Sequence, residues 1–326
     1  MFRSAIRAFC GLVLLAYASP GVANSVTIKV GYSAGGAYDT YARLVARHLP
    51  RYIDGQPDVI VQNVPGAGSM KLARMLLASE PADGSVIGMF NASIATAPIL
   101  DPNAEGLDVE GFQWIGALAR QPSLCVVAKS SEVATIEDFT AREMFIGSTG
   151  KASQTYLFAA AAKELLDAKY TIVTGFDGGA DVNAAILRGE IQGRCGTSLS
   201  AYQSGMDPDL FVPIMQIALD VPEATAHIPS LIDLIEDETD RNGLRILASS
   251  LDMDRPLALP KGTPDDILNV YRSAFLELVS DPAFLAEAIE LGLVIDPSTG
   301  AEVEALVRDI LASPSLIKDR AQEMVD

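Results

Sequence analysis

The sequence has 326 residues, with 24 lysines and arginines against 42 aspartates and glutamates, so its formal net charge is −18 at pH 7. This acidic balance argues against a nucleic-acid partner, because phosphate backbones are bound by clustered lysine and arginine. Hydrophobic residues make up 49% of the chain, which is ample for a core, and a chain of this length usually forms two domains.

The first 23 residues have the order of segments typical of a secretory signal peptide. Arg3 and Arg7 precede a short apolar run, and small residues follow it. The run is shorter than the ~20 residues that a membrane-spanning helix needs. We expect cleavage after Ala23, or alternatively after Ala18, and a soluble chain exported to the periplasm. A retained membrane anchor is the alternative.

The chain after this segment alternates between strand-like and helix-like segments. In the first series the expected strands are 26–32, 59–64 and 86–90, and the expected helices are 38–49, 69–79 and 93–100. Three strand–helix pairs in a row predict a parallel sheet covered by helices.

A polar stretch at 101–111 ends this series, and a second one follows it. Extended segments at 114–118 and 124–128 and a helix at 136–142 come first. The second series then has expected strands at 145–148, 171–176, 191–196 and 211–217 and expected helices at 153–168 and 181–188. The tail is expected to form a strand at 256–259 and helices at 264–279, 282–291 and 300–311.

Two such series with one break predict an α/β protein of two lobes joined by a hinge. We assign residues 24–117 and 253–326 to domain 1 and residues 118–252 to domain 2. Cys125 and Cys195 remain after removal of the signal segment. An oxidising compartment allows them to pair, but the sequence does not test the geometry of a disulfide, so both states stay open.

The stretch "VGYSAGG" at 30–36 fits G-x-S-x-G, the nucleophile elbow of α/β-hydrolases, with Ser33 as the nucleophile. That elbow needs an amide from a loop after an earlier strand, and here Ser33 follows the first strand. It also needs a histidine, and only His48 and His227 are present. An exported hydrolase is therefore an alternative with little support.

The same turn has a simpler interpretation as an anion-binding site. Gly35 and Gly36 leave backbone N–H groups uncovered at the start of a helix, where the helix dipole is positive. A purely structural glycine turn is the alternative. Asp39, in the first helical turn, either is stabilised there by the dipole or contacts a ligand directly.

Other turns at the carboxyl ends of strands have similar composition, at 63–69, 90–93, 147–153 and 175–180. Ligands bind at this edge in open α/β sheets, so two facing sets of turns predict a hinged clamp. A dinucleotide fingerprint at 66–71 is incomplete, because Lys71 stands in place of the third glycine. No metal-binding spacing occurs, and we expect neither a metal nor a cofactor.

The ordered motifs "GYSAGGAYD" at 31–39, "NVPGAGS" at 63–69 and "PADG" at 81–84 resemble the receptors of tripartite tricarboxylate transporters, the Bug family. "GSTGKAS" at 147–153 and "GFDGGAD" at 175–181 are similar to the glycine loops of that family's second domain. "RPLALPKGTP" at 255–264 is similar to its return strand. The likeness covers nearly all of the chain after the signal segment.

The resemblance implies a two-lobed periplasmic-binding-protein fold, type II-like, in which each lobe is a mainly parallel sheet flanked by helices. It implies a monomeric, non-enzymatic receptor that captures a small organic carboxylate and delivers it to membrane permease subunits. A periplasmic sensor that reports ligand occupancy to a membrane kinase has the same fold and stays open.

The resemblance also implies a set of ligand-binding residues, largely acting through backbone amides and hydroxyls. With the turns after the second and third strands included, they are Tyr32, Ala34, Gly35, Gly36, Asp39, Ala67, Asn91, Ser148, Thr149, Ala152, Ser153, Asp177 and Gly178. Hydrogen bonds to a charged group contribute about 1.5–3 kcal/mol each. Three or four of them make micromolar affinity reachable without a cationic side chain. Departures from the family's pattern, such as Ala34 and Asp177, leave the identity of the carboxylate open.

Overall fold

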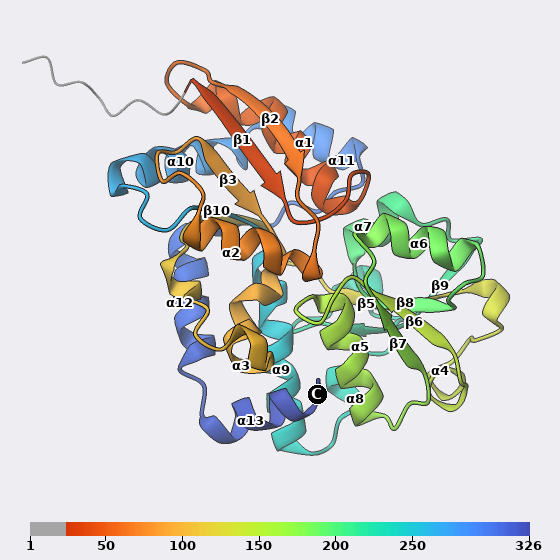
Figure 1. The fold of residues 1–326 in the computed structure, drawn as a ribbon. Helices are drawn as coiled ribbons and strands as arrows, with labels where there is room; N and C mark the ends of the chain where they lie inside the picture. Colours follow the sequence, from red (N-terminus) through yellow and green to blue (C-terminus); the bar gives the residue numbers. More distant parts are fainter. Residues whose placement is uncertain (1–23) are drawn as a thin grey trace, which may run out of the picture.

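The computed structural model describes residues 24–326, so the expected signal segment and both cleavage sites lie outside the described residues. The described chain forms two sheets, each covered by helices, at the upper left and the lower right of Figure 1. We call each sheet with its helices a lobe. In this described part, no helix is both long enough and apolar enough to cross a bilayer.

The first sheet joins strands from the two ends of the chain. From edge to edge its strands are β11 (Ser298–Thr299), β4 (Gln113–Ala119), β10 (Asp254–Leu259), β3 (Val86–Met89), β1 (Ser25–Val30) and β2 (Asp58–Asn63). β1 is parallel to β2 and β3, whereas β10 is antiparallel to both β3 and β4.

The second sheet is built from the middle of the chain. Its strands, in order, are β7 (Thr171–Thr174), β6 (Phe145–Ser148), β8 (Gly193–Ser198), β5 (Ser123–Ala128) and β9 (Phe211–Ile217). β6 is parallel to β7 and β8, and β5 is antiparallel to β8 and β9. Both sheets are therefore mixed, and not mainly parallel as the resemblance implied. The strand–helix units form the parallel part, as expected, whereas β4, β5, β9, β10 and β11 pair antiparallel with their neighbours.

Helices cover both faces of each sheet (Figure 1). In chain order they are α1 (Ala37–His48), α2 (Met70–Ala78), α3 (Ala97–Leu100), α4 (Ile136–Ala141), α5 (Gln154–Leu165), α6 (Gly179–Leu187), α7 (Leu199–Gly205), α8 (Leu231–Leu234), α9 (Glu238–Ala248), α10 (Asp265–Leu278), α11 (Pro282–Glu290), α12 (Gly300–Leu311) and α13 (Ser315–Glu323). α1, α10 and α11 share one core with the first sheet, and α2, α3 and α12 pack in another.

Strand alternation sends the side chains of β5 into two different cores. Cys125 and Val127 pack with α5 and α9, whereas Leu124 and Val126 pack with α6, as the two-residue period of a strand requires. Cys125 is bonded to Cys195 of the neighbouring strand β8. The disulfide that the sequence left open is thus present, and it joins two adjacent strands of the second sheet.

Candidate ligand-binding site

A cavity of about 500 Å³ lies between the two lobes and is lined by residues of both. The first lobe contributes the turn from β1 into α1 together with β10, and the second contributes β8, the starts of α5, α6 and α7, and the later turns of α6 and α7. These helix starts follow the carboxyl ends of β1, β6, β7 and β8. The cavity therefore lies at the sheet edge where α/β proteins bind ligands, and its size suits a small metabolite.

Several of the predicted ligand-binding residues line this cavity: Tyr32, Gly35, Gly36, Asn91 and Thr149. Asn91 Nδ2 donates a hydrogen bond to the Tyr32 hydroxyl (2.7 Å). Burial raises the pKa of Tyr32, so the phenol is a neutral hydrogen-bonding group at pH 7. The ring of Tyr38, which also lines the cavity, lies 4.7 Å from that of Tyr32.

Ser148 and Ser153, also predicted, lie behind the cavity wall and are completely buried. The hydroxyl of Thr149 donates to Ser153 Oγ (2.9 Å), and Ser148 Oγ lies 3.1 Å from Thr155 Oγ1. Thr149 and Thr155 are the residues that line the cavity. The two serines therefore position the hydroxyls of their neighbours.

Other predicted residues contact the opposite lobe and do not line the cavity: Ala67, Ala152, Asp177 and Gly178. Ser93 Oγ donates to the carbonyl of Ala152 (2.6 Å), and the Ser33 amide donates to the carbonyl of Asp177 (3.1 Å). Ala34 is exposed and does not line the cavity either. These contacts hold the lobes together around the cavity.

Asp39 turns back onto its own helix and is absent from the cavity lining. Its carboxylate accepts from the Gly35 amide (3.0 Å), from Arg43 Nε (2.9 Å) and from Asn63 Nδ2 (3.0 Å). Burial alone would raise the pKa of Asp39, but these hydrogen bonds lower it. The Gly35 amide is therefore already paired, contrary to the expectation that both glycine amides are uncovered.

Ser33 has none of the surroundings of a nucleophile. Its hydroxyl donates to Asp181 Oδ2 of the other lobe (2.6 Å). His48 is buried with its Nε2 2.5 Å from Glu287 Oε2, and His227 is exposed. Within residues 24–326 no histidine contacts Ser33, so the geometry does not support the hydrolase alternative.

Arg194, which the sequence analysis did not single out, lines the cavity and is only 6% exposed. Strand alternation puts Arg194 on the opposite face of β8 from Cys195 and beneath α6. Its Nη1 donates to the carbonyl of Gly179 (3.0 Å) and to Asn183 Oδ1 (3.1 Å). Its Nε has no hydrogen-bond partner in the described structure, and Arg194 forms no ion pair with any described residue. Burial lowers its pKa to about 10.

Arg255 is the second cation of the cavity, but its charge is balanced. Its Nη1 pairs with Asp254 Oδ1 (2.5 Å), its Nη2 donates to Ser198 Oγ (2.6 Å), and its guanidinium stacks on the ring of Tyr38 at 4.0 Å. Burial disfavours the charge, but Asp254 and the neighbouring tyrosines raise the pKa of Arg255 overall. Because Ser198 belongs to the other sheet, this pair also links the two lobes.

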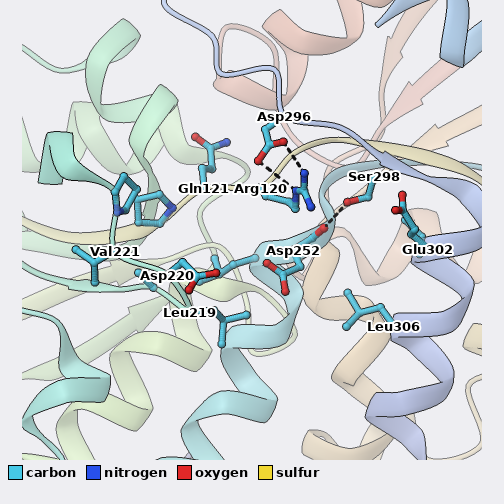
Figure 2. Close-up of a pocket in the computed structure, with 15 residues that line it drawn as sticks. Arg120, Gln121, Leu219, Asp220, Val221, Asp252, Asp296, Ser298, Glu302 and Leu306 are labelled. Carbon is cyan, nitrogen blue, oxygen red and sulfur yellow. Dashed lines mark hydrogen bonds and ion pairs between the residues drawn. The ribbon is translucent and has the colours of Figure 1, made fainter. Parts of the chain in front are cut away.

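A second cavity, of about 520 Å³, lies where β4 passes into β5 (Figure 2). None of the predicted ligand-binding residues lines it. Its one lining arginine, Arg120, is paired with Asp296 (2.6 and 3.1 Å), and further acids face it: Asp220, Asp252 and Glu302. Burial raises the pKa of Asp252. This acidic lining disfavours an anion, whereas the cavity between the lobes favours one.

Two mixed sheets with a cavity between them define a two-lobed α/β binding protein. No model of a known protein family matches the sequence. A curated relative, the UPF0065 protein in the TAR-I ttuE-ttuC′ intergenic region of Agrobacterium vitis, is 26% identical over 330 residues, covering 93% of this chain and 90% of the relative.

Solved structures with the same fold include periplasmic binding protein BugD, with a TM-score of 0.69 and 18% identity over 92% of this chain and 95% of its own. MatC from Rhodopseudomonas palustris, solved with bound malate, has a TM-score of 0.71 and 19% identity over 93% of this chain and 99% of its own. The fold predicted from the sequence is confirmed, and so is the resemblance to the Bug receptors.

Proposed function

We propose that this protein is a non-enzymatic periplasmic receptor that binds a small organic carboxylate between its lobes. The observation that carries the proposal is Arg194, a guanidinium that is buried in the cavity and has no counter-ion among residues 24–326. Burying an unpaired cation costs several kcal/mol, and a bound carboxylate would offset that cost with charge-assisted hydrogen bonds. The malate bound to MatC is consistent with such a ligand.

Backbone groups around the cavity add to the attraction for an anion. α1, α5 and α6 begin at the cavity with no side-chain hydrogen bond from their N-cap residues, Gly36, Ser153 and Gly178. The first amides of a helix have no internal partner and carry partial positive charge. Several such helix starts meeting in one cavity make it suited to a carboxylate.

Transport is the role that we propose for this binding. The resemblance to the Bug receptors supports export through a cleaved signal peptide, action in the periplasm, and delivery of the ligand to membrane permease subunits. A ligand that binds between two lobes favours the conformation in which the lobes are closed, and we propose that the permease recognises this closed conformation. A sensor that contacts a membrane kinase would use the same cavity, and no feature of the described residues favours it over transport.

The test of the binding function is a thermal-shift screen of the purified mature chain against a panel of mono-, di- and tricarboxylates and amino acids. A ligand that binds only the folded state raises the melting temperature by mass action. We expect at least one acid to do so at millimolar concentration. Failure of the whole panel would overturn the receptor function.

A pair of variants locates the binding site on the protein. A Cβ on Gly36 would be 3.9 Å from its nearest neighbour, the Ala180 amide, so a side chain fits there. Gly36→Asp places a negative charge in the cavity and should abolish the thermal shift. The matched neutral variant, Gly36→Asn, should retain a larger part of it. An equal ligand-induced rise in melting temperature in both variants would show that the ligand binds outside this cavity.

A further inference from the structure

The charges that face the cavity between the lobes leave one cation unbalanced. Among the described residues that line this cavity, the only ionised side chains at neutral pH are Arg194 and Arg255. Arg255 forms a buried ion pair with Asp254. The surplus positive charge in the cavity is therefore that of Arg194 alone.

The partial positive charges at the helix starts around the cavity are also neutralised unevenly by acidic side chains. α1 and α6 each carry an aspartate in the first turn, Asp39 and Asp181. α5 has no acid in its first turn, and it begins beside Arg194. Arg194 Nη2 lies 3.5 Å from the carbonyl of Gly196, and a Cβ on Gly196 would lie 2.5 Å from the amide of Thr155 in α5. The positive potential is thus concentrated at one end of the cavity.

The wall leading away from Arg194 becomes apolar. Along α6 the lining runs from Gly179, which contacts Arg194, to Leu187, about 12 Å further along the helix axis. The lining also includes Ala184, Ala201 and Leu291. Leu187 is 58% exposed. Arg255 lies close to Ala201, since both bind Ser198 Oγ (2.6 and 3.3 Å), but its charge is paired with Asp254, so no unpaired charge of the described chain lines this end of the cavity.

Resting on the receptor function proposed above, we propose that the ligand is a monocarboxylate with an apolar body of about six carbons. Its carboxylate pairs with Arg194 near the start of α5, and its body lies along α6 between Leu187 and Leu291. A second carboxylate at the far end would replace an apolar contact with Leu187 and Leu291 and would gain no unpaired cation in return. Arg194 is in this way the residue that sets the ligand's charge.

The test compares hexanoate with adipate, which have the same six-carbon chain and differ in one carboxylate, by isothermal titration calorimetry on the mature chain. We expect hexanoate to bind at least tenfold more tightly. Equal or tighter binding of adipate, or binding of only di- and tricarboxylates from the panel, would overturn this inference and leave the receptor function intact. Binding of no acid at all would overturn both.

Substitutions at both ends of the cavity test the placement of the ligand. Arg194→Gln should weaken hexanoate binding at least tenfold, Arg194→Lys should keep part of the affinity, and Arg188→Gln is the matched control. Arg188 is exposed, pairs with Glu190 and does not line the cavity. Equal affinity in the Arg194→Gln and Arg188→Gln variants would overturn the inference.

Leu187→Lys tests the other end of the cavity by a gain of affinity, which misfolding cannot produce. The chain should tolerate the substitution, because Leu187 is largely exposed. A lysine there supplies the missing second cation. We expect it to raise adipate affinity at least tenfold and to weaken hexanoate binding, because hexanoate loses its apolar contact with Leu187. An unchanged preference for hexanoate over adipate would show that the body of the ligand does not reach Leu187, and would overturn the proposed placement.

Discussion

Among the described residues, Arg194 is held by neutral acceptors only: the carbonyls of Gly179 and Gly196 and the side chain of Asn183. The folded chain therefore carries the cost of a buried cation until an anion arrives. The sequence predicted a strand at 191–196 and included Arg194 in it. It gave no sign that this side chain faces a cavity, because strand alternation separates two faces without saying what covers each of them.

The titration of Arg194 gives a prediction for the pH dependence of binding. Burial lowers the pKa of Arg194 to about 10. A bound carboxylate favours the protonated form, so ligand and proton bind cooperatively. We expect the affinity for the carboxylate to stay constant from about pH 7 to about pH 9 and to fall as the pH rises through about 10.

Calorimetry across this pH range measures the effect, with circular dichroism at each pH to confirm that the chain stays folded. Unchanged affinity at about pH 11 in a folded chain would contradict a charge pair with Arg194.

Asp39 shows what the sequence could predict at the level of one residue. Two roles were left open, stabilisation by the helix dipole and direct contact with a ligand. The structure favours the first, because the carboxylate binds Arg43, Asn63 and the Gly35 amide. The local sequence pattern could not decide between the two roles, because it does not show that Asn63 lies next to Asp39. The pairing of β1 with β2 brings Asn63 there.

Among the elements, the strand–helix alternation was predictable because each segment has its own period. The sequence analysis did not predict α9 or α13. It missed α9 because Gly243 lies inside that helix. A glycine inside a polar segment reads as a break. In the structure a Cβ on Gly243 would lie 2.9 Å from Met324 Cε and 3.3 Å from the Ala321 amide. The glycine therefore allows α13 to pack closely on α9, a tertiary reason that local propensity does not contain.

The disulfide bond that joins strands β5 and β8 gives a prediction about stability. Cys125 and Cys195 are 70 residues apart in sequence, and a disulfide bond typically contributes about 2–4 kcal/mol to the free energy of unfolding. The double variant Cys125→Ala/Cys195→Ala should lower the free energy of unfolding by about this amount, as measured by urea denaturation. Two free thiols in the native oxidised protein, or an unchanged midpoint in the variant, would show that the bond does not form.

At the scale of the molecule, the two lobes touch around the cavity through glycines that leave no room for a side chain. Gly150 has φ +155°, and a Cβ there would lie 2.7 Å from the Gly68 amide of the other lobe. The sequence indicated both glycine loops. It did not show that they pack against each other, since that depends on how the lobes face.

Gly150→Ala should therefore hold the lobes apart and weaken ligand binding about tenfold or more. Small-angle X-ray scattering with saturating ligand should show a larger radius of gyration than for the unmodified chain. Gly175→Ala is the control, because Gly175 also has positive φ (+109°) but a Cβ there would meet nothing within 4 Å. Equal affinities in the two variants would show that backbone strain, and not contact between the lobes, is responsible.

The most direct test of the account is a crystal structure of the mature chain with the tightest-binding acid from the panel. We predict that the carboxylate lies in the cavity between the lobes, within about 3 Å of a guanidinium nitrogen of Arg194. An acid bound in the cavity beside Arg120, or held between the lobes with its carboxylate away from Arg194, would contradict it.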